Sequence, residues 1–389
     1  MSEWKKVKLG ECCQKIGSGS TPKGGSTVYV ESGTSFIRSQ NVYNLSFDYN
    51  GLTHISEDAA NKLKGVTIFS NDILLNITGD SVARTCIVPN DVLPARVNQH
   101  VAIVRADCKK INPRFLNYYL ASPGMQAHML SLAVGKGASR NAMTKQMIEN
   151  FEVPCPPIEI QHRIATILSR YDSLIENYQK QIKLLEEAAQ RLYKEWFIDL
   201  RFPGHENTKI VDGVPEEWTP SQLGQLAEFK RGKTITKKDV IDGNIPVVAG
   251  GLEPAYYCNK SNTAERVITI SGSGANAGFT RMYFEKVWAS DCSFVDVSVT
   301  PFLHFVYCYL KDNKTTIDNM QKGAAQPHVY AKDINSLGLC IPIESILKSF
   351  EGKISKYFDS ISSLQSQLRL LTEARNRLLP KLMSGEIEI

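Results

Sequence analysis

Hydrogen-bonding side chains gather directly after a short apolar run near the N-terminus. The segment Phe36-Ile-Arg-Ser-Gln-Asn41 ends in four polar residues, Arg38, Ser39, Gln40 and Asn41. Arg pairs with guanine, and Gln or Asn with adenine, when these side chains reach the edge of a base pair. This combination, at what should be the end of a strand, indicates contact with the bases of DNA.

Further candidates in the first half also follow apolar stretches. Lys23 lies in a loop of Gly, Ser, Thr and Pro, where small side chains would let backbone amides approach phosphates, although a plain surface turn explains this loop equally well. Arg84 and Asn98-Gln-His100 could face the same surface, and Gln99 could instead stabilise its own loop. A later Gly-containing loop adds three more candidates for DNA contact, Lys136, Ser139 and Arg140.

The second half carries a comparable set with different side chains. Its densest basic cluster is Lys230-Arg-Gly-Lys233, for which a solvated surface is the main alternative. The loop that begins at Lys322 matches the loop of Lys136 in position but not in side chains, as expected for reading two unlike sequences. The candidates here are Lys230, Arg231, Lys233, Ser273, Arg281, Lys322, Gln326 and His328.

These loops belong to two copies of one unit. The spacing Trp-x4-Leu-Gly occurs at Trp4 and again at Trp218, and a long helical stretch at 157–197 recurs at 342–383. Identical positions in the two stretches include Leu184, Leu185 and Arg191, which match Leu370, Leu371 and Arg377. A duplicated unit folds as a pseudo-symmetric object, which suits a partner that also comes in two halves.

Both long stretches predict coiled-coil helices, because their apolar residues recur at alternating spacings of three and four. At about 1.5 Å per residue each helix would be roughly 55 Å long, more than a compact domain needs. The alternative is that each helix caps its own domain. Since the two apolar seams are similar in length, we expect the helices to pair antiparallel as a rigid spacer.

Short apolar or β-branched runs between turn residues predict strands in the rest of the chain, with helices at 113–132 and 301–312. Segments 73–79 and 267–272 should be equivalent strand-to-turn elements. We predict an α+β fold in which two pseudo-symmetric mixed α/β domains are separated by two long antiparallel coiled-coil helices. The expected boundaries are 1–155, 156–200, 201–340 and 341–389.

Charge and composition limit the function classes. Residues 1–155 hold 17 Lys and Arg against 12 Asp and Glu, whereas residues 201–340 hold 15 of each, so DNA would be bound by local patches. Nine cysteines without a Cys-x-x-Cys pair indicate neither a zinc site nor a disulfide framework. Without a signal peptide or a long apolar run, the chain is expected to be cytoplasmic and to bind no membrane.

The motifs of an autonomous enzyme do not occur. Asn112-Pro-Arg-Phe115 departs at its third residue from the Asn/Asp-Pro-Pro-aromatic pocket of methyltransferases. Neither Gly17-Ser-Gly-Ser-Thr-Pro-Lys23 nor Ser271-Gly-Ser-Gly274 has the spacing of a nucleotide-binding loop. We therefore predict no catalytic residue, no metal ligand and no cofactor bound by this chain.

Two motifs carry a family resemblance. They are the opening Gly17-Ser-Gly-Ser-Thr-Pro-Lys23 and the helix start Phe151-Glu-Val-Pro-Cys-Pro-Pro-Ile-Glu-Ile-Gln-His-Arg-Ile164. The second copy departs from the helix start, with Cys340-Ile-Pro-Ile-Glu344 in place of the double proline. With the duplication, the chain resembles the specificity subunit of type I restriction-modification systems over nearly its whole length.

The resemblance implies that each globular part is a target recognition domain and that double-stranded DNA with an asymmetric bipartite target is the ligand. It implies that the helices space the domains and dock two methyltransferase (modification) subunits, with Leu184, Leu185, Arg191, Leu370, Leu371 and Arg377 as candidate docking residues. S-adenosylmethionine would bind to those subunits, which methylate adenine N6. ATP and Mg would bind to two restriction subunits in the full complex.

Two alternatives stay open. A coiled-coil scaffold whose globular ends bind proteins would suit the balanced charge of residues 201–340. An orphan or phase-variable specificity subunit would borrow modification subunits encoded elsewhere.

Overall fold

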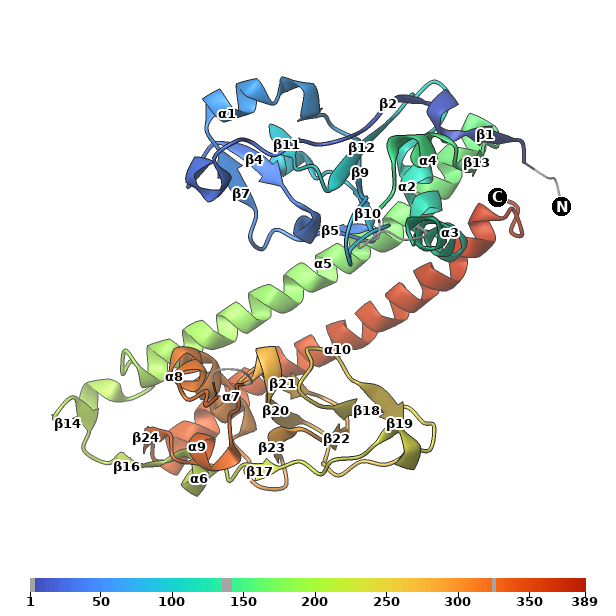
Figure 1. Cartoon of the computed structure of the whole chain (residues 1–389). Coiled ribbons are helices and arrows are strands. Elements are labelled where there is room, and N and C mark those ends of the chain that lie inside the picture. The colour runs from blue at the N-terminus through green and yellow to red at the C-terminus, as the bar shows by residue number, and fades with distance from the viewer. Residues whose placement is uncertain (1–3, 135–141, 324–326) are drawn as a thin grey trace. The chain divides into compact units, whose positions relative to one another are not determined.

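Each globular part of the chain combines small sheets with short helices, as Figure 1 shows. The structure is a computed structural model and describes residues 4–134, 142–323 and 327–389. Contacts within the chain divide it into a first unit, residues 1–177 with 368–389, and a second unit, residues 178–367. Both long helices, α5 (Ile158–Phe197) and α10 (Glu344–Met383), contribute residues to both units. None of the described helices is long and apolar enough to cross a membrane.

The first unit contains two main sheets. The antiparallel sheet β10-β9-β12-β2 has four strands, and the sheet β3-β7-β4-β11-β8 has five, of which β4 and β11 run parallel. The strands of the first sheet are β2 (Cys13–Ser18), β9 (Ile73–Asn76), β10 (Thr85–Ile87) and β12 (Val101–Ala106). Those of the second are β3 (Tyr29–Val30), β4 (Thr34–Ile37), β7 (Thr53–Ile55), β8 (Thr67–Ile68) and β11 (Ala95–Val97).

The helices at 113–133 and 145–149 share one buried core with the four-stranded sheet, whereas the helix at 57–62 packs against the five-stranded sheet. The single helix expected at 113–132 is in fact two helices, α2 (Pro113–Ala121) and α3 (Pro123–Ala133). Ser122 between them is extended, because the ring of Pro123 disfavours helical backbone at the residue before it. Other helices are α1 (Glu57–Lys62) and α4 (Lys145–Glu149), and β1 (Lys6–Lys8) pairs with β13 (Glu152–Pro154).

The second unit follows the same plan. Its antiparallel sheet β17-β23-β20-β21 consists of β17 (Lys230–Arg231), β20 (Val267–Ser271), β21 (Thr280–Tyr283) and β23 (Cys292–Asp296). A three-stranded sheet has β18 (Ile245–Val248) between β19 (Tyr256–Cys258) and β22 (Trp288–Ala289), and β18 and β22 run parallel. The helices are α6 (Leu223–Leu226), α7 (Leu303–Asp312), α8 (Lys314–Asn319) and α9 (Ala331–Asn335), and β16 (Thr219–Gln222) pairs with β24 (Gly338–Ile341).

The start of each domain shows how closely the two copies agree. The Leu9 amide donates to the carbonyl of Phe151 at 2.9 Å, and the Leu223 amide donates to that of Leu337 at 2.8 Å. Each leucine is fully buried and is followed by the glycine of the repeated Trp-x4-Leu-Gly motif. The duplication expected from the sequence therefore covers the domains as well as the helices.

Within each unit, α5 and α10 run antiparallel. In the first unit Asp172 of α5 pairs with Arg375 of α10 at 2.8 Å, and Leu168 shares a buried core with Leu379 and Leu382. In the second unit the Trp196 ring lies 5.6 Å from the ring of Phe350, while Leu185 and Leu364 line one groove. Residue numbers rise along one helix as they fall along the other, which confirms the predicted antiparallel pairing.

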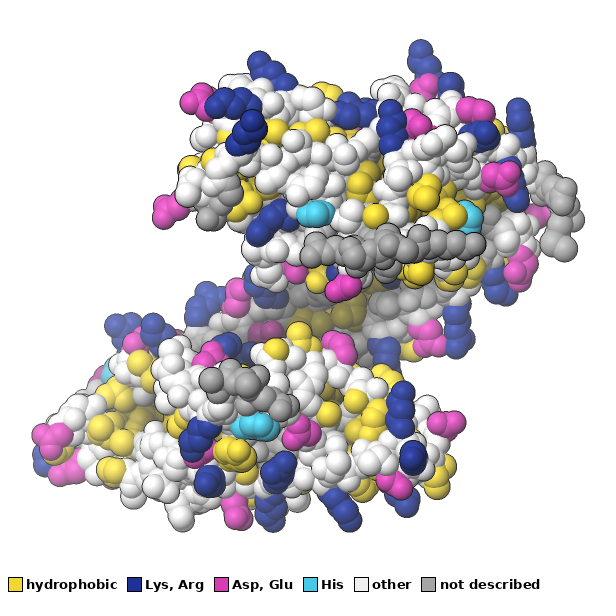
Figure 2. All heavy atoms as spheres, in the orientation of Figure 1, with side chains coloured by type: hydrophobic (Ala, Val, Ile, Leu, Met, Phe, Trp, Pro, Cys, Tyr) yellow, Lys and Arg dark blue, Asp and Glu magenta, His cyan; other side chains and the backbone are white. Residues whose placement is uncertain are grey.

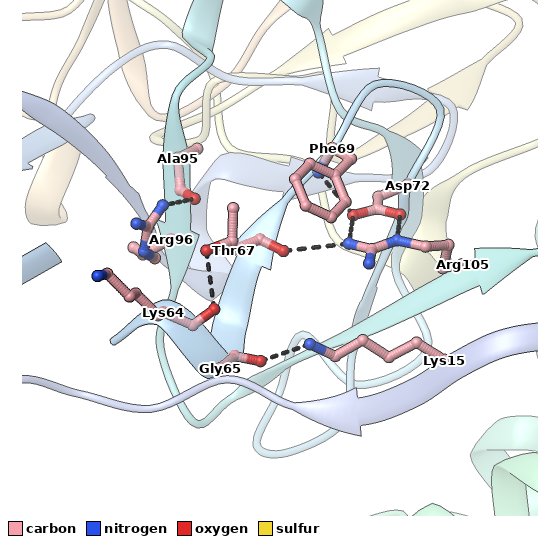
Figure 3. A network of polar contacts seen from close by, with 9 residues as sticks. All are labelled: Lys15, Lys64, Gly65, Thr67, Phe69, Asp72, Ala95, Arg96 and Arg105. Carbon is pink, nitrogen blue, oxygen red and sulfur yellow. Dashed lines mark hydrogen bonds and ion pairs between the residues drawn. The ribbon is translucent and has the colours of Figure 1, made fainter. Parts of the chain in front are cut away.

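A polar network in the first unit holds the segment before β9 against the sheet (Figure 3). The side chain of Asp72 is only 1 % exposed, and both of its oxygens accept hydrogen bonds of 2.7 Å from the Arg105 guanidinium. The same guanidinium donates to the Thr67 carbonyl at 3.1 Å and lies 4.2 Å from the centre of the Phe69 ring. Lys15 donates to the Gly65 carbonyl at 2.5 Å. These cations therefore stabilise the fold.

Candidate nucleic-acid interface

In the first unit, the ends of neighbouring strands bring several predicted residues together. The amides of Gly19, Ile77 and Asn98 donate to the carbonyls of Val101, His100 and Ile37 at 2.8, 2.9 and 3.0 Å. These hydrogen bonds join the end of β2, the end of β9, the start of β12 and the end of β4. We call the loops at 18–21, 38–41, 77–84 and 98–100 the first edge.

Polar side chains on the first edge contact one another across these loops. His100 Nδ1 lies 2.6 Å from Thr78 Oγ1, and Thr21 donates to Gln99 Oε1. Gln99 is exposed although its side chain accepts a hydrogen bond from Thr21. A loop-stabilising role and a DNA contact are therefore compatible for this residue. Lys23 is exposed two residues after Thr21.

The predicted cluster at 38–41 divides into structural and surface residues. Asn41 is fully buried: its Oδ1 accepts from the Arg38 amide at 3.0 Å, and its Nδ2 donates to the Asp48 carbonyl at 2.9 Å. Its side chain shapes the loop, so we remove Asn41 from the candidate DNA contacts. Arg38 is half-buried and donates to the Gly51 carbonyl at 2.7 Å, while Gln40 is exposed.

Ser39 and Arg84 flank this cluster. The Ser39 carbonyl accepts a hydrogen bond of 2.8 Å from Asn76 Nδ2, and the residue is half-buried. The Arg84 guanidinium lies 4.4 Å from the centre of the Tyr43 ring, which is 41 % exposed. This partly exposed pair of an aromatic ring and a guanidinium offers flat surfaces suited to nucleic acid.

The second unit repeats the backbone frame of the first edge. The amides of Gly232, Gly272 and Ser290 donate to the carbonyls of Cys292, Asp291 and Val248 at 2.8, 3.1 and 2.8 Å. These three hydrogen bonds match those of Gly19, Ile77 and Asn98. We call the loops at 231–233, 272–279, 289–291 and 327–330 the second edge.

The hydrogen bonds also give the register between the two segments that we expected to be equivalent strand-to-turn elements, 73–79 and 267–272. The Asn76 amide donates to the Arg84 carbonyl as the Ser271 amide donates to the Phe279 carbonyl, both at 2.9 Å. Gly79 therefore matches Gly274, and both take left-handed backbone, with φ of 77° and 79°.

On the second edge, predicted residues surround an acidic side chain. Ser273 donates to Asp291 Oδ2, and Arg231 Nη2 lies 3.8 Å from Asp291 Oδ1. His328 forms a backbone bridge with Ser273, and its ring stacks on the Tyr330 ring at 6.0 Å. Four predicted residues lie around this edge: Arg231, Ser273, Lys322 and His328.

Lys322 and the other candidates of the second unit have different surroundings from Asp291. Lys230 and Lys233 are exposed at the end of β17. Lys322 pairs with Asp333 at 2.9 Å. Arg281 donates to the Leu252 carbonyl at 2.8 Å, and its Nη1 lies 3.6 Å from Glu253 Oε1. The predicted residues Lys136, Ser139, Arg140 and Gln326 lie outside the described residues.

Sequence reasoning did not select Thr78 or Asp291, and it included His100 only as the last residue of the segment Asn98-Gln-His100. The signal for His100 was its position directly after an apolar run, next to Gln99. Asp291 carried no such signal, because an acidic side chain is not expected near phosphates. On the face shown in Figure 2, Lys and Arg side chains are interspersed with Asp and Glu, so charge alone does not mark the edges.

The predicted docking residues lie on the long helices with different exposure. Leu184 is 49 % exposed and Leu370 is 60 % exposed, although both are large apolar side chains. Leu185 and Leu371 are half-buried, and Arg191 and Arg377 are exposed, the latter paired with Glu373 at 2.5 Å. In the part of the chain that the structure describes, no group of three or more His, Cys, Asp or Glu could hold a metal ion.

Comparison with known families explains the duplicated frame. The profile of the family described as "Type I restriction modification DNA specificity domain" matches residues 1–187 and again residues 215–373. The chain belongs to this family. Its two matched ranges each contain one of the two edges.

Relatives agree over almost the full length. The type I restriction enzyme MjaIX specificity subunit of Methanocaldococcus jannaschii is 26 % identical, with 99 % of this chain and 93 % of the relative covered. The HindI specificity subunit of Haemophilus influenzae is 21 % identical, with both chains fully covered. A crystal structure of a type I restriction-modification S subunit from M. genitalium matches with a TM-score of 0.61 and 18 % identity, over 97 % of this chain and 96 % of that one. That structure supports the fold.

Proposed function

We propose that this chain is the DNA specificity subunit of a type I restriction-modification system and reads an asymmetric bipartite target, one half-site with each domain. The observation that carries the proposal is the repeated frame: two edges share their backbone hydrogen bonds but carry different side chains. A common backbone with different side chains suits two half-sites of unlike sequence, because base recognition depends on the side chains that reach the base edges.

The remaining candidates fit this division of work. Exposed Lys23, Lys230 and Lys233 would contact phosphates, which hold the protein on the duplex without reading sequence. Gln40, Gln99 and Arg231 would contribute to base recognition at the edges. The candidates outside the described residues, including Lys136 and Gln326, keep the role expected from their positions in the sequence.

In this proposal the chain acts in the cytoplasm and is not catalytic by itself. Two modification subunits would dock on the long helices near the exposed leucines Leu184 and Leu370 and would bind S-adenosylmethionine for methylation of adenine N6. Two restriction subunits, which use ATP and Mg, would join the full complex. The paired helices would set the number of unread base pairs between the half-sites.

The experiment that tests this function is co-expression of the chain with candidate modification subunits, followed by genome-wide mapping of N6-methyladenine. We expect methylation at one asymmetric motif made of two short half-sites with a fixed spacer. A complex that methylates without sequence preference would contradict the proposal.

DNA binding by the purified complex provides the second measurement. Binding should be sequence-specific and should weaken as salt rises, because protein cations displace counterions from phosphates. If the chain binds the modification subunits through its long helices but retains no DNA at low salt, it acts instead as a protein-binding scaffold.

A further inference from the structure

The two edges differ at one position in a way that bears on which bases they read. His100 and Asp291 occupy equivalent positions. The His100 carbonyl accepts a hydrogen bond of 2.9 Å from the amide of Ile77, which follows β9, and the Asp291 carbonyl accepts one of 3.1 Å from the amide of Gly272, which follows β20. A hydroxyl is retained beside both: Thr78 contacts His100, and Ser273 donates to Asp291. The frame and the hydroxyl are therefore kept, while the side chain that they hold is changed.

The residues around this position differ as well. Ser273 forms its backbone bridge with His328, whereas Thr78 forms the matching bridge with Ala142. Arg231 precedes Gly232 in the second edge, whereas Ser18 precedes the equivalent Gly19 in the first edge. At these two positions the second edge therefore carries larger side chains than the first, on the same backbone.

Among the residues that the structure describes, Asp291 keeps hydrogen-bonding capacity that no partner uses. Its Oδ2 accepts the Ser273 hydroxyl, but its Oδ1 is 3.8 Å from the Arg231 guanidinium, which is beyond hydrogen-bond distance. The Asp291 side chain is 38 % exposed and the Arg231 side chain is 71 % exposed. An exposed acceptor is thus held in one orientation by a serine and partly neutralised by an arginine.

A carboxylate on a DNA-binding surface has a narrow range of uses. It has no hydrogen to donate, and it repels phosphates. The base groups that donate hydrogen bonds in the major groove are the amino groups of cytosine N4 and adenine N6. An imidazole at the same position can donate as well as accept, so it selects a different set of bases.

We propose that Asp291, positioned by Ser273, is a specificity-determining residue that accepts a hydrogen bond from the amino group of a cytosine or an adenine in the half-site of the second domain. His100 determines the base at the equivalent position of the other half-site. This inference rests on the proposed function, because it assigns a base to one side chain of the same interface.

The test compares methylation maps of the unmodified chain and three variants, each co-expressed with the modification subunits. Asp291→Asn replaces the acceptor carboxylate by an amide of the same size, and His100→Asn changes the equivalent position in the first unit. Glu216→Gln is the control, since it makes the same chemical change at an exposed pair with Lys209 outside the second edge. Thermal unfolding of each purified variant shows whether the fold is kept.

Asp291→Asn should relax the preference at one position of one half-site by roughly ten- to a hundredfold and leave the other half-site and the spacer unchanged. Its affinity for non-specific DNA should rise, because a negative charge near the phosphates is lost. His100→Asn should change the other half-site only, and Glu216→Gln should change neither.

Unchanged preference at every position in the folded Asp291→Asn variant would overturn the inference, as would an equal change at all positions of both half-sites. These outcomes require a bipartite target for the unmodified chain. If the unmodified chain produces no such target, the proposed function itself fails. Failure of the proposed function can therefore be told apart from failure of the inference on Asp291.

Discussion

Gly19 occupies a point of the first edge where no side chain fits. Its amide donates to the Val101 carbonyl at 2.8 Å, and the next amide, of Ser20, donates to the Val97 carbonyl at 2.9 Å. A Cβ atom added to Gly19 would lie less than 3.0 Å from the carbonyl oxygens of Val97 and Asn98. Because these are backbone atoms, they cannot rotate away, and Gly19→Ala must push β2 away from the loop before β12.

The cost follows from these contacts. Loss of two backbone hydrogen bonds costs about 1 kcal/mol each, and overpacking adds about 1–3 kcal/mol of strain. We therefore expect Gly19→Ala to lower the free energy of unfolding of the first unit by about 3–5 kcal/mol. For a unit of this size, the midpoint of thermal unfolding should fall by about 10 °C.

The control, Gly17, lies two residues earlier, on strand β2. A Cβ atom added to Gly17 would meet no other atom within 4 Å, so Gly17→Ala should change stability by less than about 1 kcal/mol. Urea unfolding followed by circular dichroism measures both variants, and methylation mapping shows whether Gly19→Ala loses only the half-site of the first domain. Equal stability and equal recognition in the two variants would refute the reasoning.

Three further changes test other parts of the structure. Arg105→Met should lower the free energy of unfolding by about 3–5 kcal/mol in urea, because it leaves the Asp72 carboxylate buried without its ion-pair partner; a change below about 0.5 kcal/mol would show that this pair is not needed. Leu184→Asp and Leu370→Asp should weaken binding of modification subunits at least tenfold in pull-down titrations without lowering the melting temperature, since both side chains are about half exposed; full binding would place the docking surface elsewhere. Inserting seven residues into α5 should change or abolish the accepted spacer in the methylation map, and an unchanged spacer would contradict a rigid connection by the helices.

The long helices could be predicted from the sequence because their apolar spacing is regular over forty residues. The strands were recognisable where β-branched residues form short runs, as in 267–270. The break between α2 and α3 was missed because the apolar pattern continues through it, although Ser122 is followed by Pro123, which favours a helix boundary. Regular patterns were thus read correctly, and a local interruption within one of them was not.

The edges were harder to predict than the fold. Asn41 was selected for its hydrogen-bonding capacity, but its own loop uses both ends of that side chain. Thr78 and His100 come together only because β9 and β12 pair, and Ser273 and Asp291 meet in the same way across β20 and β23. A single sequence does not show which distant residues a sheet will bring within hydrogen-bond distance.

The division of the chain into units has a consequence for its synthesis. The second unit is one continuous segment, 178–367, whereas the first needs the C-terminal residues 368–389 as well. Leu379, Leu382 and Met383 are buried in the core of the first unit with Leu9, which the ribosome makes hundreds of residues earlier. The domain that is translated first is therefore completed only after all residues of the second unit have been made, and a chain that stopped before Leu379 would lack three buried residues of the first core.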